Sequence, residues 1–171
     1  KKFFGRRKVT ILKNFCVSNK VMSEGDFKRI IGELVNNHNS EENIKYLEVF
    51  TSNANNIELC KCLITNNKEE QVIRQYAALY MNKIVEKFYL NVPYLGELSE
   101  IVFNLLVEQR NRTTFFYKNL ILLFSKILYK GFDRYVNFDE FVGKFFEITE
   151  ENQLFVYSIL SSLAQSCKVV E

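Results

Sequence analysis

The chain has 171 residues, of which 47% are hydrophobic, 15% aromatic and 25% charged, with only one proline and a formal net charge of +3. This composition excludes a disordered protein and a turn-rich all-β protein, and the length suits one compact domain with its own core. No apolar run approaches the roughly 20 residues that span a bilayer, so the sequence predicts a soluble, helix-rich protein with no membrane partner.

Eight apolar-periodic segments of helical length, separated by polar stretches, predict eight helices. Ser23 and Ser40 are the expected N-caps of the first two helices. The fourth spans residues 69–89, and the lone Pro93 lies near the start of the fifth. In chain order, the apolar positions that define the helices are Phe27, Ile30, Ile31, Leu34 and Val35; Ile44, Leu47, Val49 and Phe50; Ile57, Leu59, Cys60, Leu63 and Ile64; Ile73, Tyr76, Ala77, Tyr80, Ile84 and Phe88; Leu95, Leu98, Ile101, Val102, Leu105 and Leu106; Phe116, Leu120, Leu123, Ile127 and Leu128; Phe138, Phe141, Val142, Phe145 and Phe146; and Leu154, Tyr157, Leu160, Leu163, Ala164 and Cys167.

Taken in pairs, the predicted helices form about four antiparallel hairpins, which start near residues 23, 53, 94 and 138. Intervals of about 30–45 residues are typical of helical solenoid repeats. The second helix of each pair is generally longer and opens with a charged or amide cluster. In two of these clusters, Glu41-Glu42 and Glu69-Glu70, the acids are expected to complement the helix dipole. We therefore predict an all-α, HEAT-type helical-hairpin solenoid, with an irregular all-α globule as the alternative.

Charge is distributed unevenly along the chain. Residues 1–21 hold seven basic side chains and no acid, so the remaining residues carry a small excess of acid. The sequence thus divides into a basic N-terminal arm, residues 1–21, and a mildly acidic body, residues 22–171, which favours basic partners. Because the chain starts at Lys rather than Met, the arm has three interpretations: a genuine extension, a mitochondrial-type presequence, or a sequence upstream of an initiation at Met22.

The sequence contains no motif for catalysis, a cofactor or a metal. Glycine-rich phosphate loops, nucleophile elbows and metal-spaced histidine pairs are absent, and the one histidine, His38, lies in a polar stretch that predicts a turn. Cys60 and Cys62 are too close together for a zinc site, so we expect them, with Cys16 and Cys167, to be small core residues. These observations predict a protein that is not an enzyme.

The stretch YKGFDRYVNFDEF resembles half of an EF-hand calcium loop with Glu140 at the last ligand position. The first two ligand positions would then be Tyr129 and Gly131, and Arg134 would stand where the loop needs a glycine for its sharp turn. Such a loop cannot wrap a calcium ion. We expect instead a turn at Gly131 and a linker into a helix at Phe138.

The stretch NIELCKCLITNNKEEQVIRQYAALYMNKIVEKFYLNV resembles the second HEAT repeat of the importin-β (karyopherin) superfamily. In that family a short first helix is followed by a second helix with a V-R-Q-x-A-A pattern and a basic-aromatic tail. These features correspond here to residues 73–75, 77–78 and 83–89. The pattern also has a structural explanation, because small Ala77 and Ala78 would let neighbouring helices approach closely, and Arg74 can reach a carboxylate or carbonyl of the next repeat.

The resemblance covers about residues 22–168 and is closest to the branch that imports ribosomal proteins and histones. Residues 22–52 are similar to the amino-terminal repeat, and residues 151–166 resemble the second helix of the fourth repeat. The chain departs from the family in lacking a tryptophan after the basic tail and in having about four repeats rather than many. We therefore expect either the N-terminal part of a longer receptor or a truncated relative of the family.

The resemblance implies a nuclear transport receptor of the cytoplasm and nucleus. Its partners would be the GTPase Ran in its GTP form, basic cargo such as ribosomal proteins or histones, and nucleoporins. In the family, the second helices line a concave surface. The polar residues that packing leaves over on the second helices, and that we take as candidate partner-binding residues, are Asn43, Tyr46, Gln75, Asn82, Glu86, Lys118 and Ser125.

Two further classes of function stay open on the residues alone. One is a non-catalytic scaffold or adaptor that is built from the same repeats and does not bind Ran. The other is a ribosome- or RNA-associated factor that uses the N-terminal arm, because basic side chains supply salt-dependent affinity for phosphate. The candidate nucleic-acid contacts of the arm are Lys1, Lys2, Arg6, Arg7 and Lys8.

Overall fold

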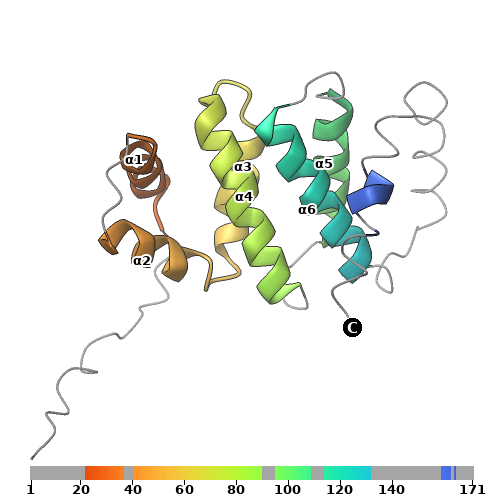
Figure 1. The fold of residues 1–171 in the computed structure, drawn as a ribbon, viewed down its shortest axis with the longest axis horizontal. Helices are drawn as coiled ribbons and strands as arrows, with labels where there is room; N and C mark the ends of the chain where they lie inside the picture. The colour runs from red at the N-terminus through yellow and green to blue at the C-terminus, as the bar shows by residue number, and fades with distance from the viewer. Residues whose placement is uncertain are drawn as a thin grey trace, which may run out of the picture.

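The computed structural model describes residues 22–36, 41–89, 95–108, 114–131, 159–162 and 164. Six helices lie in this part of the chain: α1 (Glu24–Val35), α2 (Glu41–Phe50), α3 (Asn56–Thr65), α4 (Gln71–Phe88), α5 (Leu95–Glu108) and α6 (Phe115–Gly131) (Figure 1). Residues 159–162 are also helical, and none of the described residues is in a strand. The predicted all-α class is thus confirmed for the described residues.

Two of the expected features of the helix starts are present in the structure. Ser23 is the N-cap of α1, as predicted, and its hydroxyl oxygen accepts a hydrogen bond from the backbone N–H of Asp26 at 3.1 Å. Glu41 and Glu42 lie in the first turn of α2, where they complement the helix dipole. The other predicted N-cap, Ser40, lies outside the described residues.

Glu69, the first acid of the pair before α4, has a different role from the one expected, whereas Glu70 is the N-cap residue of the helix. Because α4 begins at Gln71, Glu69 lies ahead of the helix, and the predicted start at residue 69 is wrong. The Glu69 carboxylate forms an ion pair with Lys28 of α1 at 2.5 Å and is 9% exposed. Lys28 also pairs with Glu24 at 2.7 Å, and the hydrogen bonds that its ammonium donates to these two carboxylates raise the pKa of Lys28. This acid therefore ties α1 to the segment before α4.

The four helices α3 to α6 form two hairpins that stack on each other. α3 packs against α4 and α5 against α6, while α4 lies beside α6 and α3 also contacts α5 (Figure 1). The second helices, with 18 residues in α4 and 17 in α6, are longer than the first helices, with 10 in α3 and 14 in α5. The predicted alternation of lengths is confirmed for these two pairs.

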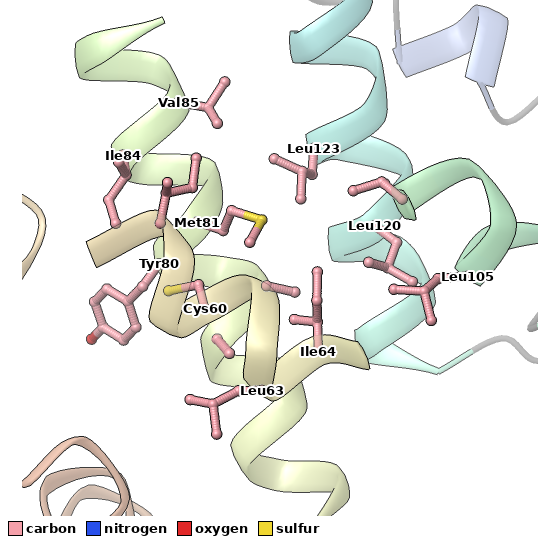
Figure 2. Close-up of a cluster of buried hydrophobic side chains, with 14 of the residues drawn as sticks. Cys60, Leu63, Ile64, Tyr80, Met81, Ile84, Val85, Leu105, Leu120 and Leu123 are labelled. Carbon is pink, nitrogen blue, oxygen red and sulfur yellow. The ribbon is translucent and has the colours of Figure 1, made fainter. Parts of the chain in front are cut away.

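The core between the hairpins is aliphatic. Met81 and Val85 of α4 point toward Leu120 and Leu123 of α6, and all four side chains are fully buried (Figure 2). Ala77 and Ala78 are also fully buried, as expected for positions where α4 approaches its neighbours closely. The stacking of the hairpins removes this apolar surface from water, and each Å² removed stabilises the stack by about 25 cal/mol.

The first helix pair departs from the predicted alternation, because α2 has 10 residues and α1 has 12. An aromatic cluster joins both helices to α4. The ring centroid of Phe27 lies 5.1 Å from that of Phe50, and both rings meet Tyr80 edge-on at 6.1 Å. Burial raises the pKa of Tyr80 to about 12. The cluster therefore fixes the first pair against the hairpin that follows it.

Two apolar residues of α2 that were expected in the core are exposed. Leu47 and Phe50 are buried, whereas Ile44 is 48% and Val49 38% exposed, so that expectation is wrong for Ile44 and Val49. Residues 43, 47 and 50 share one face of the helix. Figure 1 shows α2 beside α1 at one end of the described helices. A helix at the end of a stack is covered on one face, and its other apolar side chains meet water.

The cysteines behave differently from one another. Cys60 is fully buried in α3, as predicted, and its burial raises the pKa of the thiol. Cys62 is exposed, so its predicted core position is wrong; it lies two residues further on and therefore on another side of the helix. Cys16, Cys167, His38 and the stretch from residue 132 to Glu140 lie outside the described residues.

Candidate partner-binding face

α4 and α6 each present a row of at least partly exposed side chains at intervals of seven residues. The α4 row is Val72, Leu79 and Glu86, and the α6 row is Phe115, Leu122 and Tyr129. Seven residues are nearly two helical turns, so each row follows one line along its helix. We call these two rows, together with Gln75, Lys83, Lys118 and Lys126 beside them, the α4–α6 face.

The α6 row is the more exposed of the two. Phe115 is 53% exposed, Leu122 37% and Tyr129 39%. In the α4 row, Val72 and Leu79 are partly exposed and Glu86 is exposed. The opposite sides of the same helices carry the buried residues of the core. Large apolar side chains are therefore left in a line on the surface.

Polar contacts hold the two rows together at one end. The Glu86 carboxylate forms an ion pair with Lys126 Nζ at 2.7 Å, and Lys130 Nζ donates a hydrogen bond to the backbone carbonyl of Glu86 at 3.1 Å. The hydrogen bond from Lys126 holds the pKa of the Glu86 carboxyl below its ordinary value, so this side chain is ionised at neutral pH. Lys130 also lies over the ring of Tyr89, 4.7 Å from its centroid.

Beneath this ion pair the seam between α4 and α6 is also polar. Asn82 is 2% exposed, and its Nδ2 donates to the backbone carbonyl of Asn119 at 2.9 Å and to that of Ala78 at 3.2 Å. Asn82 Oδ1 has no hydrogen-bond partner in the described part of the chain. One amide therefore links the backbones of two helices that belong to different hairpins.

Arg74 anchors the other end of the seam. Its guanidinium donates two hydrogen bonds to the carbonyl of Ile64 in α3 and lies 4.7 Å from the centroid of the Phe116 ring in α6. Arg74 therefore reaches a carbonyl, as predicted, but that carbonyl belongs to its own hairpin. The next hairpin contributes an aromatic ring instead.

Charge separates between the two layers of helices. The basic residues of the second helices α4 and α6 are Arg74, Lys83, Lys87, Lys118, Lys126 and Lys130, and their one acid is Glu86. In the first helices, α5 carries Glu97, Glu100 and Glu108 without a base, and α3 carries Glu58 and Lys61. The layer formed by α4 and α6 is therefore basic, although the body as a whole has an excess of acid.

The structure divides the seven candidate partner-binding residues into two groups. Gln75, Glu86 and Lys118 lie on the α4–α6 face and are at least partly exposed. Tyr46 is 48% exposed on α2, outside that face. Whether these four contact a partner stays a prediction. The candidate nucleic-acid contacts of the N-terminal arm lie outside the described residues.

The other three candidates are buried, so their predicted place on an open surface is wrong. Asn43 is 4% exposed and donates to Glu33 Oε2 of α1 at 2.7 Å. Asn82 links α4 to α6, and the fully buried Ser125 donates to the carbonyl of Ile121 at 2.9 Å. Each of the three side chains donates a hydrogen bond within the protein, which is why a polar residue is tolerated there, although Asn82 Oδ1 accepts none from the described residues.

Sequence reasoning missed Phe115, Leu122 and Tyr129, because it counted only polar residues as candidates. Their spacing of seven residues, offset from the packing positions Phe116, Leu120, Leu123 and Ile127, was the available signal.

No helix among the described residues is long and apolar enough to cross a membrane. Those residues also contain no group of three or more His, Cys, Asp or Glu that could hold a metal ion.

No protein family model, curated protein or solved structure shows a significant match to this chain. The similarity to importin-β repeats therefore rests on the residues quoted above.

Proposed function

We propose that this chain is part of a HEAT-type helical-repeat protein that binds another protein through the α4–α6 face and catalyses no reaction. The stacking of the α3–α4 hairpin on the α5–α6 hairpin supports this proposal. Val72, Leu79 and Glu86 are separated from Phe115, Leu122 and Tyr129, respectively, by the same number of residues. Repeats place equivalent positions of successive units side by side, which produces a continuous binding surface.

The finer proposal is a nuclear transport receptor of the importin-β type, in which this face binds Ran in its GTP form. It is supported by the resemblance in residues 57–89, which include α4. The switch segments of such a GTPase are ordered by the γ-phosphate, so a surface of fixed shape can select the GTP form. The bases of α4 and α6 disfavour basic cargo on this face. Cargo and nucleoporin binding are therefore proposals for other parts of the protein.

A pull-down with Ran in each nucleotide state tests the finer proposal. We expect the chain to retain the GTP form and not the GDP form. The double variant Lys118→Glu, Leu122→Ser should reduce retention, because both side chains are exposed on the face. Glu100→Lys, on the exposed side of α5, is the matched control and should bind as the wild type does.

Equal retention of both nucleotide states, or of neither, would remove the transport receptor proposal. A scaffold or adaptor made of the same repeats would then be the function to pursue. If Ran binds in its GTP form but the α6 variant binds equally well, the interaction lies elsewhere on the chain, and the assignment of the face is wrong.

A further inference from the structure

We propose, resting on the binding role assigned to the α4–α6 face, that the occupant of this face is an acidic amphipathic helix of a partner protein. Such a segment carries apolar residues along one side and Asp or Glu along its flanks. Its apolar side would lie on the Phe115, Leu122 and Tyr129 row, and its acids would meet the lysines beside that row.

The apolar part of the argument comes from spacing and exposure. Exposed apolar side chains that form a contiguous patch mark interaction surfaces, whereas scattered ones are ordinary. Phe115, Leu122 and Tyr129 form a line, and partly exposed Leu79 occupies the position on α4 that is equivalent to Leu122. From residue 115 to 129 this line is about 21 Å long, which a partner helix of about 14 residues would cover. Helices recognise such surfaces through apolar residues three and four apart.

The lysines of the face predict that the partner segment is negatively charged. Lys118 lies between Phe115 and Leu122 and is exposed, and it forms no ion pair with any described residue. Lys83 on α4 is exposed as well, and its Nζ lies over the Tyr80 ring. Lys126 is held by Glu86 on the α4 side of the row. An acidic segment placed here would give Lys118 an ionic partner, and complementary charge would orient the segment and speed its association.

The opposite layer strengthens this assignment. Glu97 and Glu100 of α5 are exposed, and α5 has no base, so an acidic helix would be repelled there. Lys61 of α3 is already paired with Glu58 at 2.7 Å and Glu97 at 3.4 Å. On the α4–α6 face, unlike on α5, basic side chains and an exposed apolar row therefore lie together.

A single-stranded nucleic acid is the other polyanion to weigh against this occupant. Nucleic-acid surfaces combine a basic track with aromatic platforms on which bases stack. Here the centre of the α6 row is Leu122, which offers no stacking platform for a base. The face therefore suits an acidic helix better than a nucleic acid.

The test uses the full chain and three fluorescent peptides of about 16 residues in a fluorescence anisotropy titration. The first is a helix with Leu at alternating spacings of three and four and Glu on its flanks. The second replaces every Glu by Lys, and the third has the composition of the first in a scrambled order. We expect the first peptide to bind at least about tenfold more tightly than the others, a difference of about 1.4 kcal/mol. Added salt should weaken this binding.

Variants identify the face. Lys118→Glu and Leu122→Ser should each weaken binding of the acidic helix about tenfold, and Lys118→Glu should improve binding of the lysine peptide. The controls are Glu100→Lys on α5 and Ile44→Ser on α2, which alter an exposed charge and an exposed apolar side chain elsewhere. Thermal unfolding of every variant should match that of the wild type, because all four side chains are exposed.

Three outcomes would overturn the inference: equal binding of the scrambled peptide, equal losses in the control variants, or displacement of the acidic helix by single-stranded RNA at equal concentration. The Ran pull-down is read separately. Binding of Ran-GTP without peptide binding would remove this inference and leave the transport receptor proposal standing. Binding of the acidic helix without binding of Ran would remove the transport receptor proposal and leave this inference standing.

Discussion

The guanidinium of Arg74 in α4 donates two hydrogen bonds to the backbone carbonyl of Ile64, from Nε at 3.1 Å and from Nη2 at 2.8 Å. Ile64 lies in the last turn of α3, where carbonyl groups have no partner within the helix. The same guanidinium lies over the Phe116 ring of α6. One side chain thus caps the first helix of its own hairpin and contacts the second helix of the next.

Replacing Arg74 should therefore destabilise both hairpins. Arg74→Met keeps most of the apolar stem but removes the charged hydrogen bonds, so we expect a loss of about 1.5–3 kcal/mol in the free energy of unfolding. Arg74→Lys should lose less, since an ammonium keeps the charge but not the planar fork. Urea unfolding measures both values. Lys83→Met on the exposed side of α4 is the control, and a loss as small as that of the control would contradict the capping role.

Ala77 tests the close packing of α4. Because the side chain is fully buried, Ala77→Leu should overpack the core and lower the free energy of unfolding by about 1–3 kcal/mol. Gln71→Leu introduces the same side chain at an exposed position of the same helix and should change stability little. Thermal unfolding that leaves the Ala77 variant at the wild-type midpoint would show that α4 is not packed there as described.

The buried position of Asn82 predicts that the stability of the variant Asn82→Asp depends on pH. In Asn82→Asp, the introduced carboxyl would lie among the carbonyls of Asn119 and Ala78, which donate nothing to it. An unpaired buried charge costs about 3 kcal/mol or more at neutral pH. Burial raises the pKa of this carboxyl above its unfolded value of about 3.9, so the folded state binds the proton more tightly.

The direction of the pH dependence follows from the raised pKa of the introduced carboxyl. As the pH falls from neutral to about 5, the folded variant takes up the proton before the unfolded chain does, and the penalty relative to the wild type shrinks. Urea unfolding at the two pH values measures the change. Asn82→Leu, which introduces no charge, should show the same deficit at both. A constant deficit in the Asp variant would mean that water reaches this seam.

The ion pair of Glu86 predicts the opposite dependence, because its contribution to stability decreases as the pH falls. Its pKa is lowered chiefly by the hydrogen bond from Lys126, so its ion pair contributes fully above the unfolded pKa of the carboxyl and is lost as the pH falls through the folded pKa. A carboxyl chemical-shift titration by NMR should place the pKa of Glu86 below 4.5. In Lys126→Met the pKa should rise, whereas Lys83→Met should leave it unchanged. An unchanged pKa in Lys126→Met would show that the ion pair does not form in solution.

The repeating apolar pattern of the sequence determined the helices and their inward faces. Ser23 specified the start of α1, and residues 69–89 specified nearly the whole of α4, found at Gln71–Phe88. Ala77 and Ala78 were expected where helices approach closely, and they are fully buried. Such features are local: a cap acts within one turn, and an apolar stripe repeats every 3.6 residues whatever it packs against.

Only the tertiary structure decided which flank of each helix meets a neighbour. Asn82 and Lys118 look alike in sequence, as polar residues beside an apolar stripe, yet Asn82 lies buried in the α4–α6 seam and Lys118 is exposed. Likewise, Ile44 belongs to an apolar pattern and is exposed, because α2 lies at the end of the described helices. Periodicity reports the direction of a side chain about its own helix axis. Its burial depends on helices that are distant in the sequence, whose positions come from packing across the whole stack.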